Sequence, residues 1–224
     1  MKDPERTALL LVDLQKYYLL PDSDFARFSA LENPKALSYI RKRANTVALP
    51  AAEFLLNSFR ELSLPIFFLR LCGVEPDRGD LHHLFREAHE TGEKLGFPNV
   101  YPLADDPAAA IVDELRPRPD EFIFDKTAFS GFTHGDLEER LKEKNIQNLV
   151  FAGLATSQCV NTTARDASDR GFVVYQIEDG MADYSEEMHL SALYSSSAVC
   201  GGLIFQAMDF IQLIRAALGN DEKN

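Results

Sequence analysis

The chain lacks the features that mark several classes of protein. No apolar stretch is long enough to span a membrane, and the first apolar run meets Asp13 too soon for a signal peptide. Lysine and arginine number 23 against 35 aspartates and glutamates, and the net charge of -12 argues against nucleic acid or an anionic membrane as a partner. Three cysteines, Cys72, Cys159 and Cys200, do not amount to a disulfide framework and suit a reducing compartment, so we expect a cytoplasmic protein.

What remains is the composition of one globular domain. With 224 residues, of which 46% are hydrophobic, the chain supports a sizeable core. Neither repeats nor a flexible linker interrupt it, so we expect a single domain over residues 1–224.

Apolar runs alternate with amphipathic stretches along the chain. Strands are expected at about 7–13, 66–70, 121–125, 148–152, 172–177 and 203–207. Helices are expected at about 51–62, 135–144, 159–170, 186–198 and 208–218, and the Asn33-Pro34 and Leu49-Pro50 steps predict helix starts. Continuous apolar strands between helices are typical of a parallel sheet covered on both faces, so the expected fold class is three-layer α/β/α.

Cys159 follows a buried strand and opens a helical pattern. The strand pattern stops at Gly153, and the run from Gly153 to Val160 places the thiol on the first turn of the next helix. Unpaired N–H groups at a helix start favour a thiolate, so we expect a lowered pKa for Cys159 and backbone donors for an oxyanion nearby. A buried structural cysteine fits the local sequence equally well.

Two further strands end in charged residues. Asp13 closes the strand that begins at Thr7, and Lys126 closes the strand that begins near Glu121. Ligands bind at the carboxyl edge of open α/β sheets, where an acid, a cation and a thiol would meet. The combination predicts a nucleophilic thiol at Cys159 with Asp13 as proton acceptor and Lys126 as a fixed positive charge.

At these residues the chain resembles the isochorismatase-like superfamily of cysteine hydrolases, in its amidohydrolase branch. The resemblance is carried by Leu11 to Gln15, by Phe124 to Lys126 with Phe129 to Phe132, and by Gly153 to Asp166. It implies a six-stranded parallel sheet of order 3-2-1-4-5-6 and a Cys159–Asp13–Lys126 triad. It also implies a cis peptide at Leu154–Ala155, an oxyanion hole from the Ala155 and Cys159 N–H groups, and a homo-oligomer, dimer or tetramer.

The expected reaction is hydrolysis of the C–N bond in a small amide or ureido compound. The thiolate attacks the carbonyl, an amine or ammonia leaves, and water cleaves the thioester. Two alternatives stand beside it: a vinyl ether hydrolase of the isochorismatase type, whose members lack the cysteine, and a non-catalytic binding protein on the same fold.

Several side chains near the expected site are candidates for substrate contact. Gln15 and Tyr18 follow the acid together with Tyr17, and Phe129 and Phe132 follow the lysine. These residues either wall a small planar substrate or fill the core. Arg70 is placed beside a substrate-facing loop from Gly73 to Gly79, where it would meet a carboxylate.

We expect neither a metal nor another cofactor. Nicotinamidases of the superfamily carry an Asp-x-His pair directly after the second strand, where this chain has Leu69 to Val74. Asp80, His82, His83 and His89 lie further along and are expected on a solvated face. Near the C-terminus, Leu190, Leu193, Tyr194 and Ala198 form an apolar stripe that either pairs subunits or covers the sheet.

Overall fold

The computed structural model describes residues 1–221 as an α/β fold around one parallel sheet. The strands are β1 (Thr7–Val12), β2 (Ile66–Leu71), β3 (Phe122–Lys126), β4 (Asn148–Leu154), β5 (Val173–Ala182) and β6 (Ile204–Phe205). All neighbouring strands are parallel, and their order is β3-β2-β1-β4-β5-β6. The expected sheet is therefore confirmed. The order in which strands are added reverses between β1 and β4, which is the switch point of the sheet.

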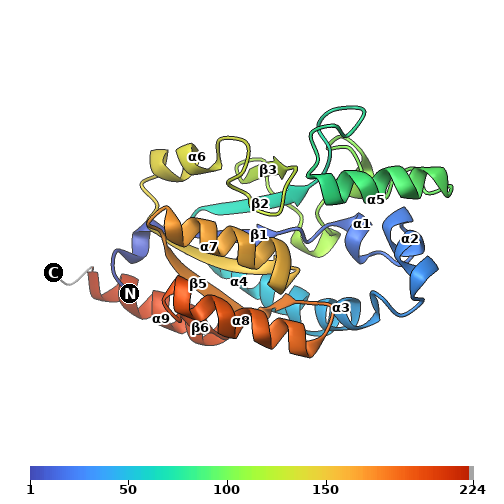
Figure 1. The fold of residues 1–224 in the computed structure, drawn as a ribbon. Coiled ribbons are helices and arrows are strands. Elements are labelled where there is room, and N and C mark those ends of the chain that lie inside the picture. The colour runs from blue at the N-terminus through green and yellow to red at the C-terminus, as the bar shows by residue number, and fades with distance from the viewer. Residues whose placement is uncertain (222–224) are drawn as a thin grey trace.

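Helices cover both faces of the sheet. The helices α6 (Leu137–Glu143), α7 (Asn161–Asp169) and α8 (Glu186–Cys200) lie on one face, with α4 (Leu49–Glu61) and α9 (Ala207–Asp221) on the other (Figure 1). The strand β1 is buried along its whole length because its alternate side chains serve both layers. Leu9 and Leu11 belong to the core around Phe59, while Leu10 and Val12 belong to the core around Val160.

Short helices lie beyond the carboxyl ends of the strands. They are α1 (Lys16–Leu19), α2 (Asp24–Glu32), α3 (Ser38–Arg43) and α5 (His83–Lys94), and Figure 1 shows α5 and α2 together at that end of the molecule. Three 3-10 helices and two π-helical turns complete the elements within residues 1–221. The 3-10 helices are η1 (Pro4–Arg6), η3 (Pro107–Ala109) and η4 (Asp113–Leu115), and the π-helical turns are η2 (Ala44–Ala48) and η5 (Thr156–Val160). No helix within residues 1–221 is both long enough and apolar enough to cross a membrane.

Two of the expected helix starts had different outcomes. The start at Leu49-Pro50 is confirmed, since α4 begins at Leu49. The start at Asn33-Pro34 is wrong, because α2 ends at Glu32 and the next helix begins at Ser38. The side chain of Asn33 accepts a hydrogen bond from Lys35 N at 2.9 Å, and this contact closes a turn at the proline in place of a helix.

The helix expected from residue 159 begins earlier. Helical backbone starts at Thr156 in η5, a wide π-type turn, and continues as α7 from Asn161. Cys159 thus lies late in this turn rather than at its start.

Candidate active site

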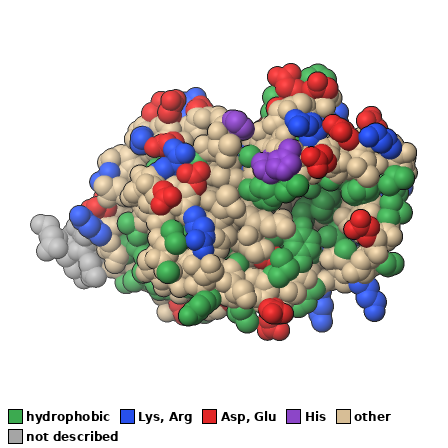
Figure 2. Space-filling model, in the orientation of Figure 1, with side chains coloured by type: hydrophobic (Ala, Val, Ile, Leu, Met, Phe, Trp, Pro, Cys, Tyr) green, Lys and Arg blue, Asp and Glu red, His purple; other side chains and the backbone are tan. Residues whose placement is uncertain are grey.

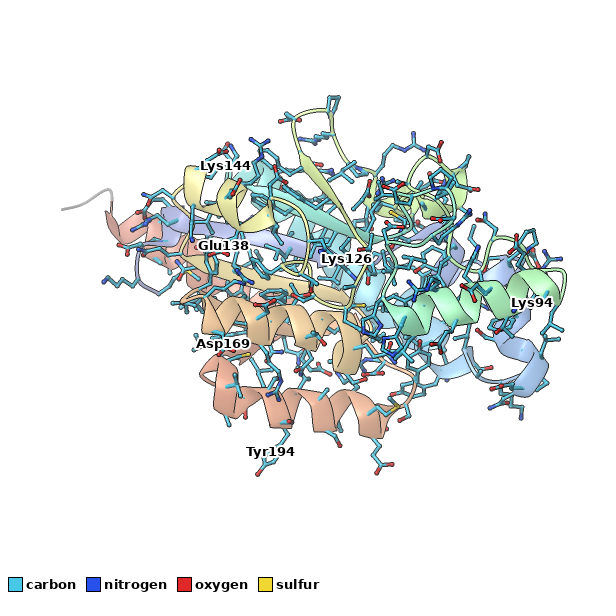
Figure 3. All side chains as sticks on the ribbon, turned by 45° about the horizontal axis from the view of Figure 1, so that its top comes forward. Lys94, Lys126, Glu138, Lys144, Asp169 and Tyr194 are labelled. Atoms are coloured by element: carbon cyan, nitrogen blue, oxygen red, sulfur yellow. The ribbon has the colours of Figure 1, made fainter. Side chains whose placement is uncertain are left out.

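Three charged or nucleophilic side chains meet at the carboxyl edge of the sheet. Lys126 Nζ lies 2.9 Å from Asp13 Oδ2 and 3.3 Å from Cys159 Sγ, and it donates to Ala128 O at 3.0 Å. Each of the three residues is at most 5% exposed. Figure 3 shows Lys126 in the middle of the molecule, where the sheet ends beside the start of α7. The predicted convergence of Asp13, Lys126 and Cys159 is confirmed by these distances.

The strand order explains how Lys126 reaches the other two groups. Lys126 is the last residue of β3 and pairs with Leu71 of β2, so β2 separates it from β1. Its long side chain crosses the end of β2 to meet Asp13. Asp13 leaves β1 in a left-handed conformation (φ 53°) and donates its N–H to Leu69 O at 2.9 Å. Aspartate is one of the few residues that adopt this conformation readily.

Gly153 brings the nucleophile strand against β1. It has φ 133°, and a Cβ atom at this position would lie 2.0 Å from Val12 O. Only glycine permits this approach of two backbones. The predicted cis peptide between Leu154 and Ala155 is present, and η5 then carries the chain to Cys159.

Burial is the largest single influence on the pKa values of Asp13, Lys126 and Cys159. It raises the pKa of Asp13, and the positive charge of Lys126 opposes that rise only in part. Burial alone would lower the pKa of Lys126, but the neighbouring Asp13 and Cys159 raise it overall. The pKa of the Cys159 thiol is raised by burial and then by Asp13, so the expectation of a lowered pKa is wrong for this residue. Cys159 lies late in η5 rather than at a helix start, and removal of the sulfur from water sets the direction of the shift in its pKa.

Two expected substrate contacts are occupied by the protein itself. Gln15 is fully buried; its Oε1 accepts from Leu71 N at 2.8 Å, and its Nε2 donates to Ala109 O at 2.8 Å. Arg70 holds Asp125 through two hydrogen bonds of 2.7 and 2.9 Å. Both side chains therefore link elements around the site.

The aromatic candidates divide into two groups. Phe129 lies on the α5 side, where its ring is 4.5 Å from that of Phe85. Tyr18 lies near it in the same core, and its hydroxyl contacts Tyr184 Oη at 2.6 Å. Phe132 instead stacks on Phe172 at 6.1 Å, with the Arg170 guanidinium 5.1 Å from its ring centroid, in the layer that holds α6 and α7. Phe132 is thus accounted for as core packing.

Three buried oxygen atoms of the site region have no hydrogen-bond partner within residues 1–221. They are Asp13 Oδ1, the hydroxyl of Tyr17 and Ser157 Oγ, and Tyr17 is 1% exposed. Burial raises the pKa of Tyr17 well above its usual value, and the nearby charges of Asp13 and Cys159 add to that rise. The phenol is therefore a neutral hydrogen-bond donor close to the triad.

The histidines do not gather around the triad. His83 is exposed, but His89 is 5% exposed and its Nδ1 accepts from Tyr101 N at 3.4 Å, so its expected place on a solvated face is wrong. Within the described residues, no three His, Cys, Asp or Glu side chains are arranged to hold a metal ion.

A hydrophobic groove lies between α2 and α5, and Figure 2 shows histidine side chains beside a band of hydrophobic ones at that end.

Four polar residues of the site region were not singled out as site residues from the sequence. Thr156 and Ser157 lie between the cis peptide and the thiol; the Thr156 hydroxyl contacts His189, and Ser157 N donates to Asp183. Thr156 and Ser157 are visible inside the motif, but His189 lies on α8 and Asp183 follows β5. No local pattern marks these two partners.

Comparison with known proteins places this geometry in a family. The profile of the isochorismatase domain matches residues 7–204. The ureidoacrylate amidohydrolase RutB of Agrobacterium fabrum is 41% identical over 70 residues, which is 31% of this chain and 31% of that protein. The alignment thus spans about a third of that relative.

Two solved structures share the fold. A cysteine hydrolase from Pseudomonas syringae pv. phaseolicola has a TM-score of 0.77 at 22% identity, covering 96% of this chain and 95% of that one. N-carbamoylsarcosine amidase from Thermoplasma acidophilum has a TM-score of 0.63 at 20% identity, covering 90% and 96%. At such identities the likeness concerns the fold.

Proposed function

Because the chain belongs to the isochorismatase family, we propose that it is a cysteine hydrolase that cleaves the C–N bond of a small amide or ureido compound. The observation that carries the proposal is the contact of one buried lysine, Lys126, with both Asp13 and Cys159. The names of the ureidoacrylate amidohydrolase and the N-carbamoylsarcosine amidase point to the same bond type.

The proposed reaction begins with a proton transfer. Because burial keeps the resting thiol protonated, Asp13 takes the Cys159 proton as the sulfur attacks the carbonyl carbon. Burial raises the pKa of Asp13, so its carboxylate accepts a proton more readily than an exposed carboxylate does. Lys126 stays positive and holds the negative charge that moves between the two groups.

The second half of the reaction returns the proton. The N–H groups of Ala155 and Cys159 hold the oxygen of the tetrahedral intermediate. Asp13 then gives its proton to the leaving nitrogen, the C–N bond breaks, and a thioester to Cys159 remains. Water attacks the thioester, and Asp13 takes a proton from that water. The C–S bond then breaks, Asp13 returns its proton to the sulfur, and the carboxylic acid and the free thiol are released.

The substrate pocket is proposed on the aromatic side of the triad. Gln15 and Arg70 are bound to the protein, so Tyr17, Tyr18 and Phe129 remain as walls. Tyr17 adds an unpaired hydroxyl that can bind a carbonyl or ureido oxygen.

A screen of small amides and ureides for ammonia release tests the proposed function. Cys159→Ala is expected to abolish release by the active compounds. Cys72→Ala is expected to keep it, because the sulfur of this buried free cysteine lies 3.9 Å from Arg70 O and is not a partner of Lys126 Nζ. Full activity in Cys159→Ala would contradict a thiol nucleophile.

Three weaker expectations stay with this proposal. We propose that the reaction uses no metal, since Cys72 and Gly73 follow β2 where metal-dependent relatives would need ligands. We also propose that the protein forms a homo-oligomer and works in the cytoplasm, where its free cysteines Cys72, Cys159 and Cys200 stay reduced.

A further inference from the structure

We infer that His189 is a positioning residue: through Thr156 it holds the backbone turn that carries the oxyanion donors and Cys159. The inference rests on the proposed function, because it concerns the same site. His189 lies on α8 and is 1% exposed, and Thr156 is the fully buried first residue of η5. Thr156 Oγ1 and His189 Nδ1 are 2.8 Å apart.

The other nitrogen of His189 is held by a charged pair. His189 Nε2 lies 3.0 Å from Glu178 Oε1, and Arg43 contacts the same carboxylate oxygen at 2.6 Å. The hydrogen bond with His189 and the charge of Arg43 lower the pKa of Glu178 to about 2, although burial opposes this. Glu178 is therefore an acceptor at any ordinary pH, and Nε2 also lies 3.0 Å from Arg43 Nη2, a donor. Because the Thr156 hydroxyl can both donate and accept, it hydrogen-bonds Nδ1 whichever ring nitrogen carries the proton.

The arrangement links three distant segments to one turn. Glu178 lies on β5 and Arg43 ends α3, where its Nε also donates to Met181 O at 3.0 Å. The neighbouring residue of the turn is fixed as well, because Ser157 N donates to Asp183 Oδ2 at 2.6 Å. The side chain of Thr156 and the backbone N–H of Ser157 thus both have partners outside their own helix.

This rigidity has a chemical consequence. The proposed oxyanion donors are backbone N–H groups at Ala155 and Cys159, and Thr156 sits between them in the chain. Backbone donors cannot be re-aimed by a rotamer change, so their direction depends on what holds the turn. A displacement of about 1 Å at such a site costs up to about 100-fold in rate.

The test separates the hydroxyl of Thr156 from the shape of its side chain. Thr156→Val keeps the shape and loses the hydroxyl, Thr156→Ser keeps the hydroxyl and loses a methyl group, and His189→Phe keeps a ring without hydrogen bonds. Ser196→Ala is a matched control, because Ser196 also joins α8 to β5, through Gln176 Oε1 at 2.8 Å, but away from the thiol.

Acetaldehyde labelled with carbon-13 is the probe, because an aldehyde this small can react with the thiol without side chains that recognise it. The Cys159 thiol adds across its carbonyl: the S–C bond forms, the π bond breaks, and the oxygen takes the proton and sits at the oxyanion donors. The dissociation constant of this adduct, read by carbon NMR, is expected to rise about 10- to 100-fold in Thr156→Val and His189→Phe. It should change less than about threefold in Thr156→Ser and Ser196→Ala.

Opposite results would overturn the inference. If Thr156→Val binds the aldehyde like the parent protein while Thr156→Ser is impaired, the methyl group matters and the hydrogen bond does not. Failure of the proposed function is recognised separately, because Cys159→Ala would then release ammonia or form the adduct regardless of Thr156.

Discussion

At the scale of single residues, burial decides the chemistry of the triad. Asp13, Lys126 and Cys159 are removed from water together, so only their mutual contacts keep two opposite charges in the interior. The thiol stays protonated at rest, and this makes the carboxylate the critical partner. Two predictions concern that carboxylate.

Replacing the acid should remove the proton acceptor while keeping its shape. We expect Asp13→Asn to lower kcat by about 10²- to 10⁴-fold, the usual contribution of a general base. Asp125→Asn is the control, because Asp125 also lies near a strand end but pairs with Arg70. Initial rates of ammonia release measure both. Equal losses in the two variants would show that Asp13 has no special role.

The pH profile should report the environment of Asp13. The reactive form has Asp13 ionised, and its pKa is raised above the ordinary 3.8 by burial. As the pH falls through this raised pKa, Asp13 takes up a proton and kcat/KM falls. We therefore expect the acid limb of kcat/KM above pH 3.8. An acid limb at or below that value would mean that another group controls it.

At the scale of elements, the site depends on how closely β4 approaches β1. The two strands are paired along Thr7–Val12, and the contact is closest where Gly153 faces Val12. The turn that carries Cys159 follows β4 directly, so the spacing between β1 and β4 sets the position of the nucleophile.

Gly153→Ala should therefore damage the fold more than other glycine substitutions. A methyl group would meet Val12 O at 2.0 Å in addition to the strain of a positive φ, and we expect a loss of more than about 3 kcal/mol in the free energy of unfolding. Gly171→Ala, which has positive φ but open space, should lose about 1–2 kcal/mol. Urea denaturation measures both. Similar losses would refute the steric argument.

At the scale of the whole molecule, part of the apolar stripe on α8 is exposed to solvent. The apolar stripe of α8 is divided: Leu193 is 4% exposed and covers the sheet, whereas Leu190 is 52% and Tyr194 is 83% exposed. Figure 3 shows Tyr194 projecting away from the molecule. Leu193 thus fits the alternative in which the stripe covers the sheet, and the exposed part is where we propose that subunits pair.

Charges on this face should prevent the proposed association. We expect the double variant Leu190→Glu and Tyr194→Glu to shift the mass measured by light scattering to that of a monomer. Met208→Glu, which changes an equally exposed apolar residue on α9, should leave the oligomer intact. A parent protein that is monomeric at all concentrations would contradict the proposal.

The sequence by itself determined the strands, their parallel arrangement and the three residues that meet at the sheet edge. Strand periodicity is local, and parallel strands must deliver their last residues to one edge, so Asp13, Lys126 and Cys159 could be found in advance. The position of the cis peptide came from the resemblance. The partners of buried polar groups were decided only by tertiary structure, because they come from segments far apart in the chain.

Three residues illustrate what the fold decided. Gln15 and Arg70 looked free in the sequence, yet Leu71, Ala109 and Asp125 occupy their polar atoms. The pKa of Cys159 was judged from its helix, but its direction is set by the atoms that exclude water, which belong to several elements. Local pattern thus determines where a side chain sits along an element, and packing determines what surrounds it.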